Sequence, residues 1–246
     1  MKNFFKNLDF EEVQIDEFWS FVFKKEKNLT PIEKISECVG DFWTFTAIHP
    51  TSKLVFAHLS GKRITENAIK FLHTIKKRLK STAFYLTTDG NEMYINAMNS
   101  VFGNLKNGTM MFPADLCYAQ VVKEFEKNKC TGIRKKIILG TPDEIENYLA
   151  KSEVSVQINT SFIERSNLTF RQHNKRIERR TQGFSKLTEY FKHQINLTSS
   201  YYNFCLPHLS LQRSDGDRVV HYSPAMAAGV TDHVWSFSEI LNFPVN

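Results

Sequence analysis

The sequence predicts an α/β fold, in which a mixed sheet is flanked by helices. Three runs rich in aromatic and β-branched residues open the chain, and such runs are typical of strands. Helical and strand-like segments then alternate, and two longer helical segments follow one another toward the carboxyl end. Leading strands followed by alternating elements favour a mixed sheet with helices packed on its faces.

The composition is that of a globular protein. At 246 residues the chain is long enough for one substantial domain, or for one domain with an appendage. A hydrophobic content of 41% indicates a packed core. The four cysteines show no C-x-x-C pair, which argues against a zinc finger and a disulfide framework. No apolar run approaches the roughly 20 residues that cross a bilayer, and MKNFFKNLDFEE turns acidic too early for a signal peptide. We therefore expect a cytoplasmic protein without membrane contact.

The three leading strands are expected at residues 13–23, 42–49 and 54–59. The first reads VQIDEFWSFVF and the second FWTFTAIH, both aromatic and β-branched. The turn PTSK at 50–53 joins the second run to the third, so these two should form a hairpin. A helix is expected at residues 62–80, because apolar residues recur there with a helical period.

The alternating part of the chain comes next. Its expected elements are a strand at 83–88, a helix at 93–102, a strand at 116–125 and a short helix at 141–149. Residues 127–136 are basic and loop-like, and predict no regular element. They belong to an interval of about 126–158 that we expect to be an insertion.

Two longer helices are expected at residues 159–180 and 185–205, followed by a polar, turn-rich candidate hinge at 212–217. Short helices at 223–229 and 234–241 complete the predicted elements. The expected domain organisation is therefore a core at 1–209, which includes the insertion, and a C-terminal helical tail at 210–246.

The segment at residues 159–180, NTSFIERSNLTFRQHNKRIERR, combines an acid at its head with a run of cations. It carries six cations and two carboxylates, so 6 − 2 = +4, against a net charge of +6 for the whole chain. Ser161 and Glu164 match the S-x-x-E capping box. Arg171 lies two turns beyond Glu164 on its face of the helix, and Lys175 lies one turn further. These two cations suit a DNA backbone, and they are equally consistent with a solvated helix face.

Two further acids stand out. Asp16 lies in the middle of an apolar strand, where a carboxylate costs several kcal/mol unless it is paired or metal-bound. Asp89 ends a strand, and ligands of open α/β sheets collect at the carboxyl ends of strands. The fold can bring both to Glu164, and carboxylates without His or Cys ligands select Mg²⁺ or Mn²⁺. Glu17 points to the other face of its strand by alternation, so we leave it out of this set.

Each of these three acids also has an ordinary alternative explanation. Asp16 could form a salt bridge to a basic side chain, and Asp89 precedes a glycine in a common turn signal. Glu164 could serve only as a helix cap. The combination of the three acids is more informative than any one of them.

Six stretches carry a resemblance to a known family. They are VQIDEFWSFV at 13–22, FWTFTAIHPTSKLVFAHLSG at 42–61, LTTDG at 86–90, NTSFIERSNLTFRQHNKRIERRTQGFSK at 159–186, YYNFCLPHLSL at 201–211 and YSPAMAAGVTDHVWSFSEIL at 222–241. Together they cover most of the chain, and E-R-x-N-L-T-x-R and S-P-A-M-A-A-G are its most specific motifs. On these stretches the chain resembles the DDE transposases of bacterial insertion sequences, whose catalytic core has the RNase H-like fold shared with retroviral integrases.

The resemblance implies a catalytic triad of Asp16, Asp89 and Glu164 that binds Mg²⁺ or Mn²⁺, most simply as two ions. Transposases of this kind hydrolyse a phosphodiester to free a 3′-hydroxyl, and this hydroxyl then attacks target DNA without a covalent protein–DNA intermediate.

The resemblance also assigns DNA contacts. It gives Arg171 the place of the basic residue that contacts DNA two turns after the catalytic acid, and we expect Asn167, Lys175 and Arg176 to bind DNA beside it. The implied partner is double-stranded DNA, at the element ends and at the target, bound by a homo-oligomer associated with the nucleoid.

Members of this family usually carry an amino-terminal helix-turn-helix or zinc-binding region that recognises the element ends. The first catalytic strand here is expected to start at about residue 13, so we expect no such region ahead of it in this sequence. Two alternatives stay open. The protein could be a nuclease of the same fold that cuts DNA without joining it, or a truncated or repurposed DNA-binding remnant without catalysis.

Overall fold

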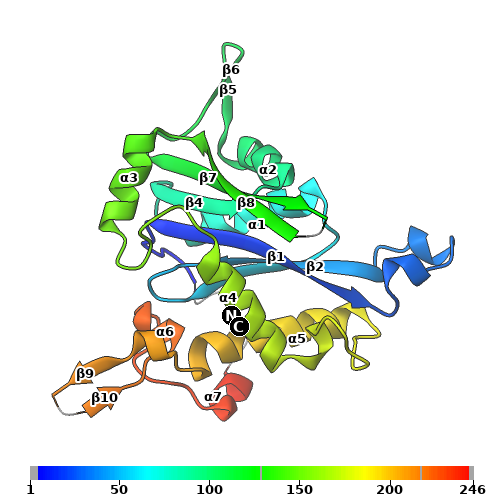
Figure 1. Cartoon of the computed structure of the whole chain (residues 1–246). Coiled ribbons are helices and arrows are strands. Elements are labelled where there is room, and N and C mark those ends of the chain that lie inside the picture. The colour runs from blue at the N-terminus through cyan, green and yellow to red at the C-terminus, as the bar shows by residue number, and fades with distance from the viewer. Residues whose placement is uncertain (1–4, 128, 217, 244–246) are drawn as a thin grey trace.

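The computed structural model describes residues 5–127, 129–216 and 218–243 and is built around one six-stranded mixed sheet (Figure 1). The strands, in their order across the sheet, are β3 (Val55–Gly61), β2 (Gly40–Ile48), β1 (Glu12–Val22), β4 (Phe84–Asp89), β7 (Leu116–Glu126) and β8 (Lys129–Leu139). The ladder is antiparallel from β3 to β1 and between β7 and β8, whereas β4 runs parallel to both of its neighbours. The predicted α/β class and the predicted β2–β3 hairpin are confirmed.

Helices α1 (Thr65–Arg78) and α2 (Glu92–Phe102) cover one face of the sheet. The apolar period predicted for α1 is the one that is buried, and Phe71 packs at 5.8 Å from Phe45 of β2, measured between ring centroids. Tyr94 of α2 meets the same Phe45 edge-on. This cluster is the largest hydrophobic core of the described residues.

The opposite face carries α3 (Pro142–Lys151), α4 (Ser161–His173) and α5 (Thr188–Ser200), and α5 continues into one π-helical turn, η4 (Tyr201–Cys205). A second hydrophobic cluster joins β1 to α4 and α5, since Phe18, Phe170 and Phe191 are all fully buried in it. Because the side chains of β1 alternate, Ile15 belongs to the first core and Phe18 to the second. The face covered by α4 is the one that carries Asp16.

Short elements decorate the sheet and the carboxyl end. They are η1 (Glu26–Asn28), η2 (Glu33–Ile35), β5 (Asn104–Lys106), β6 (Thr109–Met111), η3 (Lys175–Ile177), η5 (Leu209–Leu211), β9 (Arg213–Asp215), β10 (Arg218–Val220), α6 (Pro224–Ala227) and α7 (Phe237–Asn242). The β5–β6 and β9–β10 hairpins project from the molecule (Figure 1). The carboxyl-terminal segment packs on the sheet domain, with the Trp235 ring 4.6 Å from that of Phe204.

The candidate hinge at 212–217 includes one short strand. Residues 213–215 form β9 of a hairpin with β10, and residue 217 lies outside the described residues. None of the helices within the described ranges combines the length and apolar character needed to cross a membrane.

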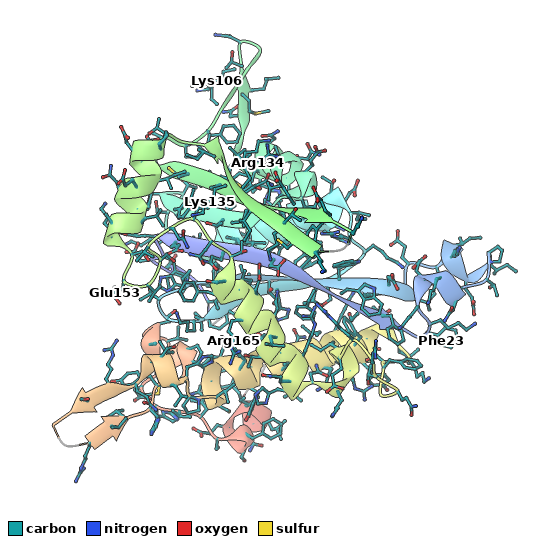
Figure 2. All side chains as sticks on the ribbon, in the orientation of Figure 1. Phe23, Lys106, Arg134, Lys135, Glu153 and Arg165 are labelled. Carbon is teal, nitrogen blue, oxygen red and sulfur yellow. The ribbon has the colours of Figure 1, made fainter. Side chains whose placement is uncertain are left out.

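The prediction of a loop at 127–136 is wrong. Residues 129–139 form β8, an edge strand that pairs antiparallel with β7 over its whole length. Its side chains are mostly exposed, so no apolar alternation marks it as a strand, and the cations Arg134 and Lys135 stand on it (Figure 2). The main-chain hydrogen bonds to β7, rather than buried side chains, define this element.

The prediction of one continuous helix at 159–180 is also wrong. Helix α4 ends at His173, and Asn174 adopts an extended conformation before the short turn η3. The side chain of Asn174 accepts a hydrogen bond from the N–H of Arg176 and donates one to the hydroxyl of Thr198 on α5. These bonds replace the continuing helical ladder, so α4 ends at His173 and only the short turn η3 follows.

The predicted capping box of Ser161 and Glu164 does not form. The N-cap is Thr160, and the carboxylate of Glu164 accepts a hydrogen bond from the Thr160 hydroxyl, with Oγ1–Oε1 2.9 Å. Because the helix begins at Ser161, Glu164 is one position too far along to cap the N–H that the motif requires.

Candidate functional site

Asp16 and Asp89 become neighbours through the parallel pairing of β1 with β4. The last pair of this ladder is Gln14 opposite Thr87, and each aspartate follows two residues later on the same face as its strand partner. Asp89 is the last residue of β4, so both carboxylates lie where the two strands separate. This is the carboxyl end of a parallel strand, the position at which open α/β sheets collect their ligands.

Helix α4 orients the carboxylate of Asp16. The Nδ2 of Asn167 donates a hydrogen bond to Asp16 Oδ2 at 2.9 Å, and the Oδ1 of Asn167 accepts one from the Thr46 hydroxyl at 2.8 Å. Asn167 is only 2% exposed. Its carboxamide therefore connects α4 to β1 and β2, and holds Asp16 in one orientation.

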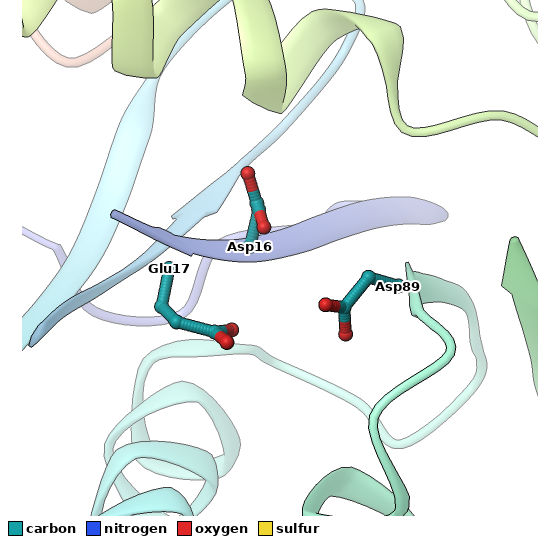
Figure 3. A group of neighbouring side chains, drawn as sticks. All are labelled: Asp16, Glu17 and Asp89. Atoms are coloured by element: carbon teal, nitrogen blue, oxygen red, sulfur yellow. The ribbon is translucent and has the colours of Figure 1, made fainter. Parts of the chain in front are cut away.

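Glu17 joins this pair of acids, contrary to the expectation from strand alternation. Figure 3 shows Asp16 and Glu17 leaving opposite sides of β1, as alternation requires, with Asp89 beside them. The longer side chain of Glu17 nevertheless brings its carboxylate toward Asp89, and one oxygen of each of the three acids lies within 4.8 Å of the others. Leaving Glu17 out of the acidic cluster was wrong, because alternation determines where a side chain starts and not where a glutamate ends.

Glu17 already has partners on its own face of the sheet. The guanidinium of Arg63, in the loop before α1, forms an ion pair with Glu17, with Nε donating to Oε1 at 2.7 Å. The hydroxyl of Tyr94 on α2 donates to the other oxygen of Glu17. Arg63 also approaches Asp89, with Nη2 3.8 Å from Oδ2, so one cation serves two of the three acids.

Two of these acids, Asp16 and Asp89, have raised pKa values. Burial, followed by the charges of Glu17 and Asp89, raises the pKa of Asp16 to about 7. Burial and the charge of Glu17 raise the pKa of Asp89 to about 6, although Arg63 acts against this. Carboxyl groups that bind protons near neutral pH would also be stabilised by another positive charge, such as a bound cation.

Glu164 borders the same pocket but stands apart from the acidic cluster. It lies in the first turn of α4, where its Oε1 accepts a hydrogen bond from Lys123 Nζ of β7 at 2.6 Å. The pocket has a volume of about 650 Å³ and is bordered by Asp16, Glu17 and Asp89 as well as by Glu164. The three acids expected from the sequence thus face one pocket, with Glu164 held at its rim by a lysine.

Two arginines complete the pocket wall. The guanidinium of Arg171 lies 5.4 Å from the centroid of the Phe18 ring, and its buried Nε has no hydrogen-bond partner among the described residues. Burial and the nearby Arg179 lower the pKa of Arg171. Arg179 also lines the pocket. An arginine that is desolvated, close to another arginine and incompletely hydrogen-bonded is well placed to receive an anion.

The other residues expected to bind DNA are Asn167, which lines the pocket, and Lys175 and Arg176, which do not. Asn167 is buried against Asp16, so its amide is not presented to solvent. Lys175 and Arg176 lie in η3, beyond the end of α4, and neither borders the pocket. Lys175 is exposed and forms an ion pair with Glu178 at 3.2 Å. The placement of Lys175 one turn beyond Arg171 on the same helix face was wrong, because α4 stops at His173.

Sequence reasoning missed Lys123, Arg63 and Arg179 as parts of the site. Lys123 follows two residues after Val121, which is the β7 partner of Asp89, so it shares a face with the acids. This signal becomes readable only when the order of strands is known. Arg63 stands in a loop, and no local pattern marks it.

The donor set suits a hard divalent cation. The converging ligand atoms are carboxylate oxygens, and no histidine or cysteine is among the described residues that line the pocket. The raised pKa values of Asp16 and Asp89 show that a positive charge between them would be stabilised. Asp16, Glu17 and Asp89 could therefore hold a metal ion.

Comparison with known proteins adds no family to this description. No protein-family model matches the chain, and a search among curated proteins finds no relative.

Proposed function

We propose that this protein is a DDE-type DNA transposase with an RNase H-like catalytic core. The observation that carries the proposal is the meeting of Asp16, Asp89 and Glu164 at one open pocket, although they are far apart in the sequence. The sheet supports it, since an antiparallel β3-β2-β1 meander beside parallel β4 and β7 suits an RNase H-like core. The motifs that resemble those of insertion-sequence transposases are the reason for proposing transposition as the activity.

The residues of the pocket have separable tasks. Asp16 and Asp89 would hold the divalent ions, and Glu164 would join them once its oxygen is released from Lys123. Such ions, when bound, activate the attacking oxygen and stabilise the leaving oxygen of a phosphoryl transfer. Asn167 keeps Asp16 oriented, as the hydrogen-bonding neighbours of metal ligands generally do.

The cations at the rim would hold the DNA strand. Three cations line the pocket beside the acids: Arg171, Arg179 and Lys123. Each can donate a hydrogen bond to a non-bridging phosphate oxygen. In the first step water attacks the phosphorus at the element end, and the departing strand keeps a 3′-hydroxyl. In the second step that hydroxyl oxygen bonds to a target phosphorus, and the displaced target oxygen leaves as a new 3′-hydroxyl. The first step breaks one phosphodiester and consumes one water, whose proton ends on the 3′-oxygen and whose oxygen stays on the 5′-phosphate. In the second step one phosphodiester breaks and one forms.

A DNA-joining assay tests this proposal. The purified chain is mixed with Mg²⁺ or Mn²⁺, a plasmid target, and a pre-cleaved duplex copied from the DNA that flanks the coding region. We expect joined products from the wild type, and a loss of at least about 100-fold from Asp16→Asn, Asp89→Asn or Glu164→Gln, because metal ligation is lost. The matched control Glu146→Gln removes an exposed carboxylate of α3 and should join normally.

Three outcomes separate the alternatives. Cutting without joining would identify a nuclease of the same fold. Salt-sensitive DNA binding that needs no divalent ion, with no cutting, would identify a non-catalytic binding protein. In such a protein Glu164 would stay paired with Lys123 and would bind no metal ion. Normal joining by Asp89→Asn would overturn the assignment of the acids.

A further inference from the structure

Helix α4 separates the candidate site from a second pocket on its other flank. The candidate site is lined from α4 by Glu164, Asn167, Leu168 and Arg171. The second pocket is lined from α4 by Phe162, Arg165, Ser166, Thr169 and Gln172. Each set follows helical spacing, so α4 is a wall with one lined pocket on either side.

The second pocket is basic. It has a volume of about 490 Å³ and lies between the β2–β3 turn, α4 and the segment that follows η4. Lys53, Arg165 and His208 line it, and none of the described residues in its wall is acidic. Arg165 is exposed, and Figure 2 labels it on α4, on the side of the helix toward the carboxyl-terminal elements. Neither Lys53 nor Arg165 forms an ion pair with any described carboxylate.

The β2–β3 turn places Lys53 in this pocket. Lys53 has a φ of 59°, a left-handed conformation that few residues other than glycine adopt. Its ammonium donates to the carbonyl of Pro50 and lies 3.8 Å from the centroid of the Phe162 ring. Burial lowers the pKa of Lys53 to about 8, and only the charge of Glu12 acts against this. A partly desolvated ammonium without a paired carboxylate is stabilised by any anion that enters beside it.

His208 lies against the same two cations. Its Nε2 is buried and has no hydrogen-bond partner among the described residues. Burial and the charges of Lys53 and Arg165 lower the pKa of His208 to about 4, so the ring is neutral near pH 7. The edge of this ring meets Tyr202, which forms part of the pocket floor. The wall thus combines two cations, an unsatisfied ring nitrogen and the polar side chains of Thr169 and Gln172.

We propose that this second pocket binds a phosphate group, and that nucleic acid bound at the candidate site supplies it. The second half of this statement rests on the proposed function. Helix α4 is about 10–12 Å across with its side chains. A strand that rises 3.4 Å per nucleotide therefore crosses it within roughly four nucleotides. One strand can reach the acids on one flank of α4 and the phosphate pocket on the other.

The first experiment tests the pocket without DNA. Inorganic phosphate is titrated into ¹⁵N-labelled full-length protein at constant ionic strength, and backbone shifts are followed. We expect shifts around residues 53, 165 and 208, and an affinity about tenfold weaker in Lys53→Gln or Arg165→Gln, because each removes one charge-assisted hydrogen bond. Arg165→Lys should bind phosphate nearly as well as the wild type. Lys70→Gln removes the same charge from an exposed position of α1 and should have no effect. Equal phosphate binding by wild type and Arg165→Gln would overturn the proposal.

The second experiment identifies the source of the phosphate. Binding of a fluorescent DNA duplex is measured as a function of salt for the same variants. We expect Arg165→Gln to weaken binding to every sequence and to reduce the slope of log affinity against log salt by about 0.9. An unchanged slope, with phosphate binding weakened, would overturn nucleic acid as the source. If the wild type binds no DNA at all, the proposed function fails, and the phosphate titration still decides whether the pocket binds an anion.

Discussion

At the scale of single residues, the raised pKa values of two acids shape how stability depends on pH. The pKa of Asp16 rises from 3.8 to about 7 and that of Asp89 to about 6. A carboxyl group with a raised pKa binds its proton more tightly in the folded state, so its stabilising contribution is full below about pH 4 and is lost as pH rises toward 7. The half-buried His49 and His58 act oppositely: desolvation lowers their pKa to about 4, and their contribution is lost as pH falls below about 6.5.

Asp16→Asn isolates the carboxyl contribution. The neutral amide keeps the shape of the side chain and can still accept the hydrogen bond from Asn167. We expect the variant, free of metal, to be more stable than the wild type by about 1–3 kcal/mol at pH 8, with the gain shrinking toward pH 5. Urea unfolding in EDTA at several pH values measures this difference.

Added Mg²⁺ should then reverse the order of stabilities at pH 8. The ion stabilises the wild type in proportion to its occupancy and has little to bind in Asp16→Asn. Glu146→Gln, on the surface of α3, should respond to Mg²⁺ like the wild type. If Asp16→Asn in EDTA is no more stable than the wild type at pH 8, the charged Asp16 carboxylate does not destabilise the folded protein.

Some residues of the candidate site could be predicted from the sequence and others could not, and the difference has a physical reason. Asp16 and Asp89 could be found because an acid inside or at the end of an apolar strand is unusual in itself. Lys123 reaches the site because β7 lies beside β4, and Arg63 reaches it from a loop. Neither the order of the strands nor the path of the loop can be read from the residues around these two cations. Glu17 was excluded by a correct statement about strand alternation that ignored the length of its side chain.

At the scale of elements, the end of α4 determines which cations reach the site. The Asn174 side chain satisfies the N–H of Arg176 and the hydroxyl of Thr198, and Asn174 itself is buried. An asparagine within a run of good helix formers gave a weak stop signal, since propensity alone favoured continuing the helix. The tertiary contact with α5 decides the outcome, and a contact of that kind cannot be read from the segment itself.

Asn174→Ala should therefore destabilise the protein. The change removes the acceptor of the Arg176 N–H and one donor to the Thr198 hydroxyl, which keeps its own bond to the Gln194 carbonyl, and we expect a loss of about 1–2 kcal/mol. Urea unfolding measures the loss, and far-UV circular dichroism would reveal any extension of α4 toward Lys175. Gln172→Ala, exposed in the last turn of α4, should stay within about 0.5 kcal/mol of the wild type. If both variants unfold at the same urea concentration, Asn174 does not hold the break.

The elements that were predicted well share a buried face. Strands β1, β2 and β4 bury most of their side chains, so they appear in the sequence as aromatic and β-branched runs. Helix α1 buries one stripe, and its apolar period is visible in the sequence. Strand β8 has no fully buried side chain, and only its last three residues pack partly on the cores. Its hydrogen bonds to β7 define it, so its charged sequence resembles a loop. The accuracy of the sequence-based elements thus follows how much each element contributes to the cores.

At the scale of the whole molecule, the distribution of charge matters more than its sum. The chain carries +6 in total, yet the candidate site places four acids, Asp16, Glu17, Asp89 and Glu164, inside a rim of cations. A DNA phosphate that approaches Arg171 and Arg179 must also approach these acids. Like charges close together in a partly buried site repel by several kcal/mol, so the acids must be neutralised before a strand can settle in the pocket.

This electrostatic arrangement predicts that divalent ions strengthen DNA binding. We expect Mg²⁺ to increase the affinity of the wild type for duplex DNA by about tenfold relative to EDTA, equivalent to about 1.4 kcal/mol. The double variant Asp16→Asn/Asp89→Asn, which lacks the repelling charges, should bind DNA more tightly than the wild type in EDTA and gain little from Mg²⁺. Fluorescence anisotropy at constant ionic strength measures both effects, with Glu146→Gln as the control that should follow the wild type. Ordinary screening by Mg²⁺ would instead weaken binding equally in all three proteins, and that result would show that DNA binds away from the acids.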